Sequence, residues 1–484
     1  MDRRSEEPEE QPDMPVRSEE RGKRIDRRAL LTATAAAVTA TLLAPAARAD
    51  QPGSADQPGS ANRADRQVST VVRELNALSH PLRSTEPTGR TSDLRPLDAM
   101  IGDATVVGLG EATHGAHEFF TMKQRVLRHL VEEKGFTTFA LETSWSGGLR
   151  IDDYVQGRTG GDARQLVKET MGRSPWERQE FADLIDWMRD HNREHPLRPV
   201  HFLGDDLEFP AIGDHLFDRV TAYVREAAPG SLPRLEQLYA GLRPFDDAIG
   251  YLTTRPLTER RQNAAVAQRT LELVTAARGG GESGGESDEA YAWAVQNARS
   301  IARTFAFCAV DLEDAADMTA MQSLRDRAMT DNTLWWQRRT GGKVLLSAHN
   351  GHVGYRSSDP ELYPRTQGEH LRDALGADYV AIGFTFGRGS FLTKDSPFAP
   401  DWKVVTVPPA TAGMNEYVLD RVRPRDYYLD LRSAPPATRA WLDTARPTYD
   451  AGTEFRGDPL PRLAIGPAYD ALVHLHETGA ARLL

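Results

Sequence analysis

The sequence has a single cysteine, Cys308, and only seven lysines among its 59 basic residues. One cysteine cannot form a disulfide bond within the chain, so stability has to come from packing. Acidic residues exceed basic ones to give a net charge of −11, which argues against a broad nucleic-acid surface. The remaining composition, 39% hydrophobic and 27% charged over 484 residues, is that of a globular protein with room for two or three domains.

The first 67 residues read as targeting and linker sequence. A basic stretch ends in Arg27-Arg28, an uncharged run covers residues 29–43, and Ala47-Arg48-Ala49 has the small residues of a signal-peptidase site. The run is too short for a spanning helix. We therefore predict a twin-arginine export signal over residues 1–49 and a secreted or cell-envelope location, with an uncleaved anchor as the alternative. A Pro/Gly/Ser repeat predicts a flexible linker over residues 50–67, and the folded part then covers 68–484.

Beyond the linker, short apolar runs alternate with segments of helical period, which predicts an α/β fold with a mostly parallel sheet flanked by helices. A helix over residues 119–134, ended by Gly135, joins the first two strands. Residues 209–340 are rich in Ala, Leu, Arg and Glu and predict an all-helical insertion between the third and fourth strands. The expected strands are Thr105–Leu109, Thr137–Leu141, Val200–Leu203, Val344–Ser347, Tyr379–Phe384 and Tyr427–Leu429.

Ionisable residues follow the first four of these strands. Ligands of open α/β sheets bind outside the carboxyl ends of the strands, so we expect these side chains to line one pocket. They are Glu111, His114 and His117 after the first strand, Glu142 after the second, Asp206 after the third, and His349 and His352 after the fourth.

This residue set favours hydrolysis by activated water. Histidine takes and returns a proton near neutral pH, and Glu111 or Glu142 could orient the imidazole of His114 and stabilise its charged form. No nucleophile is evident, because the only G-x-S-x-G match, around Ser283, lies in a glycine-rich loop and Cys308 lies in an apolar helical stretch. Lys123, a rare lysine near the motif, could donate to a carboxylate of the cluster or to an oxyanion on the substrate.

Two alternatives use the same histidines, and a third uses the glycines that precede them. The H-x-x-H pairs His114/His117 and His349/His352 could ligate zinc in a metal-dependent hydrolase, although the H-E-x-x-H pattern is absent. An exported haem- or metal-binding protein could use the same histidines as ligands. The Gly108-x-Gly110 pair hints at a dinucleotide site, but the third glycine is misplaced and Glu111 would repel a pyrophosphate.

With these motifs in view, the chain resembles the erythromycin esterase family. The resemblance spans about residues 94–431, and the E-x-x-H and A-H-N-x-H blocks are its most specific parts. It is carried by GLGEATHGAHEFFTMKQRVLRHLVEEKGFTTFALE (108–142), HFLGDD (201–206), RDRAMTDN (325–332), LLSAHNGH (345–352) and DALGADYVAIGFTFGRG (373–389).

The resemblance implies an α/β core with an added helical portion, a deep cleft, and hydrolysis of a carboxylic ester such as a macrolide lactone, with no required metal or cofactor. It also implies a small-molecule partner, with no nucleic acid and no membrane after signal cleavage, and a link to antibiotic resistance. The family's catalytic positions fall on Glu111, His114, Lys123, Glu142, His349 and His352, with His114 as the base. Lys123 replaces a commonly occurring arginine, which keeps the charge but loses the bidentate fork. We further expect His117, Trp145 and Asp206 to bind the substrate.

Overall fold

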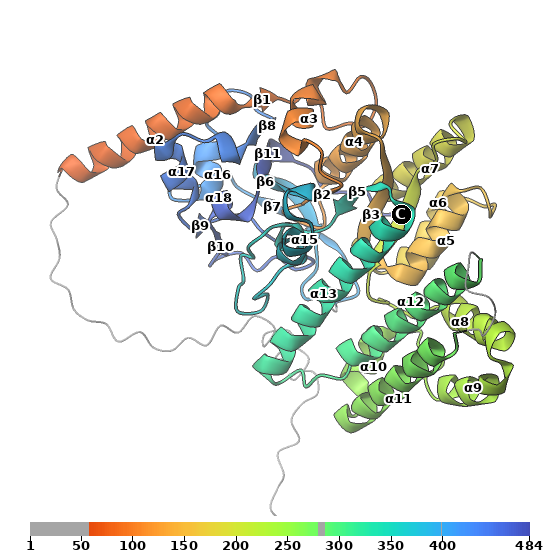
Figure 1. Ribbon diagram of the computed structural model, residues 1–484. Helices are drawn as coiled ribbons and strands as arrows, with labels where there is room; N and C mark the ends of the chain where they lie inside the picture. The colour runs from red at the N-terminus through yellow and green to blue at the C-terminus, as the bar shows by residue number, and fades with distance from the viewer. Residues whose placement is uncertain (1–57, 279–285, 398) are drawn as a thin grey trace, which may run out of the picture.

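The computed structural model describes residues 58–278, 286–397 and 399–484 (Figure 1). The export signal predicted over 1–49 and the loop around Ser283 lie outside these residues. The strands are β1 (His80–Pro81), β2 (Val106–Leu109), β3 (Phe136–Ser144), β4 (His201–Asp206), β5 (Lys343–Ser347), β6 (Tyr379–Thr393), β7 (Lys403–Val407), β8 (Tyr427–Asp430), β9 (Arg446–Pro447), β10 (Arg462–Leu463) and β11 (Ala471–Thr478).

Within the described residues, nine strands form one sheet in the order β1-β8-β11-β6-β2-β5-β3-β4, with β7 paired to β6. The six strands from β11 to β4 run parallel to their neighbours, whereas β1, β7 and β8 pair antiparallel. This confirms the expected α/β class with a mostly parallel sheet. All six expected strands are present, but sequence reasoning missed β11, whose ALVHLHET run mixes histidines into an apolar stretch.

Helices cover both faces of the sheet. They are α2 (Pro58–Leu78), α3 (Arg95–Ile101), α4 (His117–Lys134), α5 (Trp145–Val155), α6 (Ala163–Met171), α7 (Gln179–Glu194), α14 (Asn350–Val353), α15 (Gln367–Leu375), α16 (Asn415–Leu419), α17 (Pro436–Leu442) and α18 (Ile465–Ala468), with short 3₁₀ turns η1 (Ser92–Leu94), η3 (Gly376–Asp378) and η4 (Leu431–Ser433). Helix α4 begins at His117 and ends at Lys134, and the following Gly135 caps it with a φ of 70°, in the left-handed region that glycine tolerates.

The strand sequences explain why the sheet is buried on both sides. Along β2, Val106 packs into one apolar core and Val107 into the other, and along β5 the side chains of Val344 and Leu346 alternate with that of Leu345. Helices α2 and α13 contribute to the first core, and α4 and α7 to the second. A strand that is covered by helices on both faces therefore needs apolar side chains at successive positions, not an alternation of apolar and polar ones.

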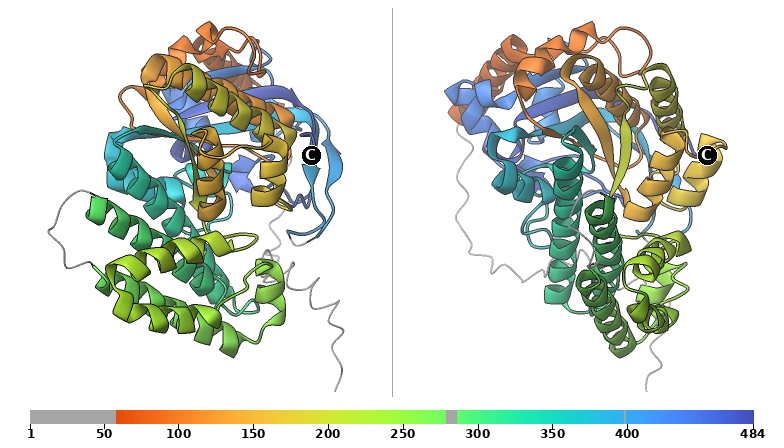
Figure 2. Two further views of the ribbon diagram at one scale, coloured as in Figure 1. Left: turned by 90° about the vertical axis from the view of Figure 1, so that its right-hand side faces the viewer. Right: turned by 45° about the vertical axis from the view of Figure 1, so that its right-hand side comes forward.

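Between β4 and β5 the described chain forms helices and contributes no strand to the sheet. These helices are α8 (Asp214–Ala227), η2 (Pro229–Ser231), α9 (Leu232–Ala240), α10 (Ala248–Thr254), α11 (Leu257–Ala276), α12 (Glu286–Phe307) and α13 (Ala315–Thr340). Figure 2 shows α8 to α12 gathered below the sheet, with α13 leading back to β5. Cys308, just after α12, is buried as expected of a core thiol.

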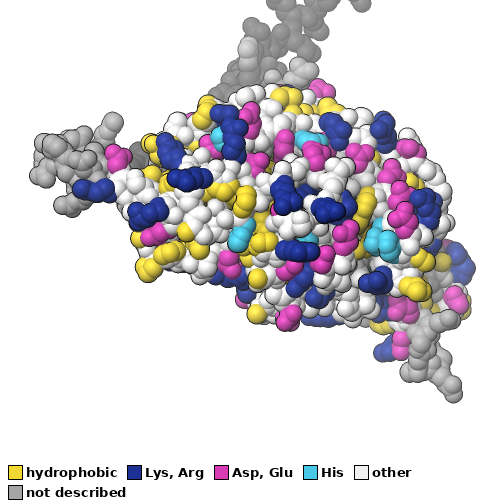
Figure 3. All heavy atoms as spheres, turned by 90° about the horizontal axis from the view of Figure 1, so that it is seen from above, with side chains coloured by type: hydrophobic (Ala, Val, Ile, Leu, Met, Phe, Trp, Pro, Cys, Tyr) yellow, Lys and Arg dark blue, Asp and Glu magenta, His cyan; other side chains and the backbone are white. Residues whose placement is uncertain are grey.

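The structure differs from the sequence prediction at the linker. Residues 58–67 of the predicted linker over 50–67 belong to α2, whose Val71 and Leu75 pack into the core. Among the described residues, no helix combines the length and the apolar character needed to cross a bilayer. On the face shown in Figure 3, basic and acidic side chains are interspersed and apolar side chains are scattered.

Candidate active site

Four neighbouring parallel strands, in the order β2-β5-β3-β4, bring polar residues to one edge of the sheet. The side chains that sequence reasoning placed there do come together: the His114 and His349 rings lie 5.0 Å apart between centroids, and Glu142 accepts from the backbone N–H of His349 at 2.9 Å. His352 Nε2 lies 3.5 Å from Glu142 Oε1. The carboxyl edge of the sheet therefore forms a single polar cluster.

The Glu111 carboxylate holds both a histidine and a lysine. Its Oε1 lies 2.6 Å from His114 Nδ1, and its Oε2 accepts from the Lys123 ammonium group. Glu111 and Lys123 are fully buried, so Lys123 is neither a surface lysine nor directed at bulk solvent. Burial raises the pKa of Glu111, but the charges of Lys123 and His114 outweigh burial and keep it below its usual value.

His114 is arranged to be a neutral base. Burial lowers its pKa from 6.5, although Glu111 and Glu142 oppose the change. A neutral ring donates its Nδ1–H to Glu111, which leaves the Nε2 lone pair without a partner among the described residues. The ring is fixed by the edge of Trp176, 4.9 Å away, and Nε2 faces Gly452, where a Cβ would lie 3.8 Å from it.

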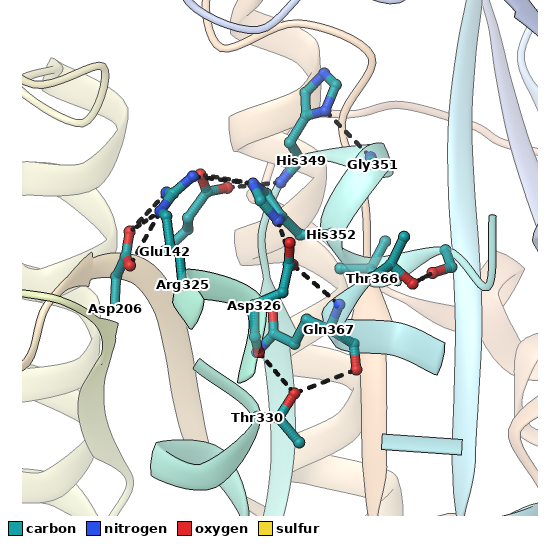
Figure 4. A network of polar contacts seen from close by, with 12 residues as sticks. Glu142, Asp206, Arg325, Asp326, Thr330, His349, Gly351, His352, Thr366 and Gln367 are labelled. Carbon is teal, nitrogen blue, oxygen red and sulfur yellow. Dashed lines mark hydrogen bonds and ion pairs between the residues drawn. The ribbon is translucent and has the colours of Figure 1, made fainter. Parts of the chain in front are cut away.

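A second network joins Glu142, Asp206, Arg325 and His352 (Figure 4). Arg325, on α13, donates to Glu142 Oε1 at 2.7 Å and to both oxygens of Asp206 at 2.6–3.1 Å. Its Nη1 also lies 3.1 Å from His352 Nε2, and His352 Nδ1 lies 2.7 Å from Asp326 Oδ1. A neutral His352 can accept from Arg325, and a protonated one can donate to Glu142, so the ring has a partner in either state.

Glu142 owes its direction to an irregularity in β3. The pairing of β3 with β4 shifts register between Leu141 and Ser144, so Glu142 lies in a bulge, a feature that re-aims side chains next to active sites. Burial raises the pKa of Glu142, but His352, Arg325 and His114 together lower it well below its usual value. Glu142 is therefore a fixed negative charge in the cluster and binds Arg325, whereas Glu111 orients His114.

His349 turns away from the Glu142 network, as Figure 4 shows. Its Nδ1 accepts from the backbone N–H of Gly351 at 3.1 Å, and its Nε2 lies 3.2 Å from Asp450 Oδ1. Asp450 is anchored through its other oxygen by Ser358 at 2.6 Å. Burial lowers the pKa of His349, but the carboxylates of Asp450, Glu142 and Glu111 together outweigh burial and raise it above 6.5, with Asp450 contributing most. The cluster thus holds a neutral histidine beside one that favours its charged form.

Two of the three residues expected to bind substrate lie elsewhere. His117 contacts Glu180 at 2.6 Å and Glu86 at 3.0 Å instead of the His114 cluster, because it begins α4 and faces α7. Trp145 is fully buried: its Nε1 donates to Asn297, and its ring packs against Trp293 and Trp335. The structure thus places the Trp145 indole in the apolar layer beside α12 and α13, and a substrate contact of Trp145 stays a prediction. Asp206 does belong to the cluster, where it pairs with Arg325.

Sequence reasoning missed Arg325, Asp326 and Asp450. Arg325 and Asp326 begin the RDRAMTDN block that carried the resemblance, but they lie inside a long helix and not at a strand end. That block was the available signal for both. Asp450 lies in a loop about a hundred residues after His349, and no local pattern marks it.

The metal alternative can be tested on this geometry. Among residues 58–278, 286–397 and 399–484, no three His, Cys, Asp or Glu side chains converge as metal ligands. The Arg325 guanidinium occupies the centre of the carboxylates and of His352, where a cation would have to bind. The donor set present here therefore does not fit a catalytic zinc site.

The fold and the site define an α/β protein with a histidine–carboxylate cluster at the carboxyl edge of its sheet. The family model described as erythromycin esterase matches residues 131–478, and the chain belongs to this family. The matched segment includes Glu142, Asp206, Arg325, His349 and His352, while Glu111 and His114 precede it.

Two erythromycin esterases of Escherichia coli are similar to this chain. The chain is 25% identical to erythromycin esterase type II of Escherichia coli over 63% of this chain and 74% of the relative. It is 23% identical to erythromycin esterase type I of the same organism, over 70% of this chain and 85% of the relative. Both relatives carry esterase names, in keeping with the hydrolase family that the match over residues 131–478 shows.

Solved structures share the fold. A Bacillus cereus protein superposes with a TM-score of 0.75 at 29% identity, covering 86% of this chain and 99% of the other. A protein described as a succinoglycan biosynthesis protein gives 0.74 at 28% identity, covering 86% and 98%. A histidine-to-asparagine mutant of the erythromycin esterase EreC, in an open conformation, gives 0.64 at 18% identity, covering 81% and 95%.

Proposed function

We propose that this protein hydrolyses a carboxylic ester, with a macrolide lactone as the leading substrate class, and that His114 activates the attacking water. One observation carries the proposal: His114 donates Nδ1–H to a buried carboxylate while its Nε2 lone pair remains open beside Gly452. This is the arrangement of a general base with an orienting acid. The names of the two Escherichia coli relatives support a macrolide as the substrate.

In the proposed reaction, a water molecule donates to His114 Nε2 and attacks the ester carbonyl carbon. The proton moves to Nε2, and Glu111 stabilises the imidazolium through Nδ1. The positive charge of His349, whose ring lies 5.0 Å from that of His114 and whose side chain is 13% exposed, favours the oxyanion of the tetrahedral intermediate. The carbon–oxygen bond to the alkoxy group then breaks, and the imidazolium returns its proton to the leaving oxygen.

The described residues favour water over a side-chain nucleophile. No serine, threonine or cysteine in this part of the chain bonds to His114, and its neighbours are Glu111, Trp176 and His349. Burial raises the pKa of Cys308 to about 12, so this thiol would not supply a thiolate at neutral pH.

The direct test is a panel of macrolides and simple esters incubated with the purified protein and followed by mass spectrometry. Opening of a lactone adds one water to the mass, whereas hydrolysis of a simple ester yields separate acid and alcohol. We expect at least one lactone to gain a water at a rate proportional to enzyme concentration. Intact masses across all lactones and esters would contradict the ester-hydrolase proposal.

We also propose, from the sequence alone, that the protein acts outside the cytoplasm. The basis is the Arg27-Arg28 pair, the apolar run over residues 29–43 and the Ala47-Arg48-Ala49 site. Expression in a host with twin-arginine export should place the wild type in the envelope or medium, and the R27K/R28K variant should remain in the cytoplasm. Equal distribution of the two forms would contradict export by this route.

A further inference from the structure

A pocket of about 490 Å³ lies on helices α12 and α13, outside the active site. Both sites use α13, but Arg325 turns toward Glu142 and Asp206, whereas the residues that α13 contributes to the pocket begin at Asp331. Its volume lies in the range of small-molecule sites, which is about 300–1,000 Å³. The proposed esterase reaction uses none of the residues that line it.

Arginine dominates the walls of this pocket. The lining includes Arg299 and Arg303 of α12 and Arg338 and Arg339 of α13, with Asp331 as the one lining carboxylate. Asp331 is paired with Arg303, and Arg339 is paired with Glu289. Four guanidinium groups against two carboxylates leave an excess of two positive charges in a protein whose net charge is −11.

Three guanidinium groups have unused donors. Arg303 Nη1 is buried and makes no hydrogen bond to any residue that the structure describes, and a buried donor without a partner is costly. Arg299 donates to Gln296, and neither it nor Arg338 forms an ion pair within the described chain. Burial and the charge of Arg303 lower the pKa of Arg299, although the charge of Asp331 opposes the change.

The pocket also has an aromatic wall that is held in place. The Trp335 ring lies 4.8 Å from the ring of Trp293 and 5.5 Å from that of Trp145, both edge to face. The Arg339 guanidinium lies 5.4 Å from the Trp335 centroid. An indole fixed by two neighbouring indoles offers a preorganised apolar surface beside the arginines.

We propose that this pocket binds a small organic phosphate, with the phosphate on Arg299, Arg303 and Arg338 and the organic body against Trp335. A phosphate dianion matches the excess of two positive charges. Guanidinium forks also bind phosphate oxygens in pairs, which a single ammonium group cannot do. The acidic net charge of the molecule favours a small anion over a nucleic acid.

Isothermal titration calorimetry of the full chain with phenyl phosphate, inorganic phosphate and phenol tests the proposal. We expect phenyl phosphate to bind more tightly than inorganic phosphate, and phenol to give no binding. The R299Q/R338Q double variant removes two arginines that lack carboxylate partners and should weaken phenyl phosphate binding by about 10- to 100-fold. The W335L variant should lose the advantage of phenyl phosphate over inorganic phosphate.

The matched control is R193Q, which removes an exposed arginine of α7 and should change affinity by less than about twofold. Circular dichroism establishes that each variant is folded. No measurable heat with phenyl phosphate in the wild type would overturn the proposal. The same holds for unchanged affinity in R299Q/R338Q or for binding of phenol as tight as that of phenyl phosphate.

Discussion

At the scale of single residues, the active site separates two histidines by their partners. His114 is buried against a carboxylate that Lys123 already neutralises, and its pKa is lowered from 6.5. His349 faces Asp450, which forms no ion pair with a Lys or Arg among the described residues, and the pKa of His349 is raised. When the surroundings drive the pKa values of two titratable groups apart, one group can act as a base while the other stays a cation.

This separation predicts a bell-shaped pH dependence of kcat/KM. Activity should fall as the pH drops through the pKa of His114, below 6.5, because protonated His114 cannot take a proton from water. Activity should also fall as the pH rises through the pKa of His349, above 6.5, because the positive charge is then lost. The D450N variant removes the main cause of the raised pKa, so its alkaline limb should move to lower pH.

The control for D450N is D443N, which removes an exposed carboxylate from the end of α17. Rates for both variants would be measured from pH 5 to pH 10 with the ester identified in the panel. The acid limb, which reports His114, should stay within about half a unit in D450N. An alkaline limb that superimposes on that of the wild type would show that Asp450 does not set the charge of His349.

At the scale of elements, α13 delivers two charged residues to the site from consecutive positions. Successive helical residues point about 100° apart, so Arg325 meets Glu142 and Asp206 while Asp326 meets His352 and the backbone N–H of Gln367. The helix therefore links strands β3 and β4 to α14 and α15. Its position sets the geometry of a network to which four other elements contribute.

The R325K variant tests this role. Lysine keeps the charge but cannot bind Glu142 and Asp206 together in the planar geometry of a guanidinium group. We expect kcat to fall by about 10²-fold, since small displacements of catalytic groups cost that much. Steady-state kinetics with R327K, an exposed arginine on the same helix, would provide the control. Equal kcat values for R325K and the wild type would rule out the role.

The element that carries a residue also determines whether its place in the site can be predicted from the sequence. Glu111, Glu142, Asp206 and His349 follow or end parallel strands, and such ends meet at one edge by geometry alone. Trp145 also follows a strand, but as the first residue of α5 it turns into the apolar layer of Trp293 and Trp335. Strand order has to be known before that direction can be assigned.

At the scale of the whole molecule, sequence patterns predicted the sheet and its flanking helices. They did not predict the contacts between segments that lie far apart in the sequence. The six expected strands and helix α4 follow from periodicity, because each is determined by its own residues. The short strand β1, the edge strand β7 and the central β11 depend on partners far along the chain. Asp450 also reaches the site through a contact between distant segments. The N–H of Ala451 donates to Ala112 O at 2.7 Å, and this bond holds the loop that carries Asp450 beside His114.

One such long-range contact, between His117 and Glu180, predicts how the stability of the fold depends on pH. The hydrogen bond to Glu180 raises the pKa of His117 to about 9, and Glu86 adds to this effect; Glu180 also holds Arg482 near the C-terminus. Because this folded-state pKa exceeds the usual 6.5, the stabilisation is complete below about pH 6.5 and is lost as the pH rises through 9. It therefore favours the folded state at neutral and acidic pH.

Urea unfolding of H117Q against the wild type measures this contribution. At pH 6 the variant should be less stable by about 1–3 kcal/mol, the value of a hydrogen bond to a charged group, and the difference should shrink toward pH 10. The control H195Q removes an exposed histidine at the end of α7. A difference between H117Q and the wild type that is constant from pH 6 to pH 10 would contradict the linkage.

The measurement that tests the central claim most directly is the turnover of H114Q, compared with H117Q, on the ester that the wild type hydrolyses. Glutamine can still hydrogen-bond Glu111 but cannot take a proton from water. The account predicts that kcat of H114Q falls by about 10²–10⁴-fold while H117Q, three residues away and outside the cluster, stays near the wild type. Near-normal turnover by a folded H114Q would contradict the assignment of His114 as the base.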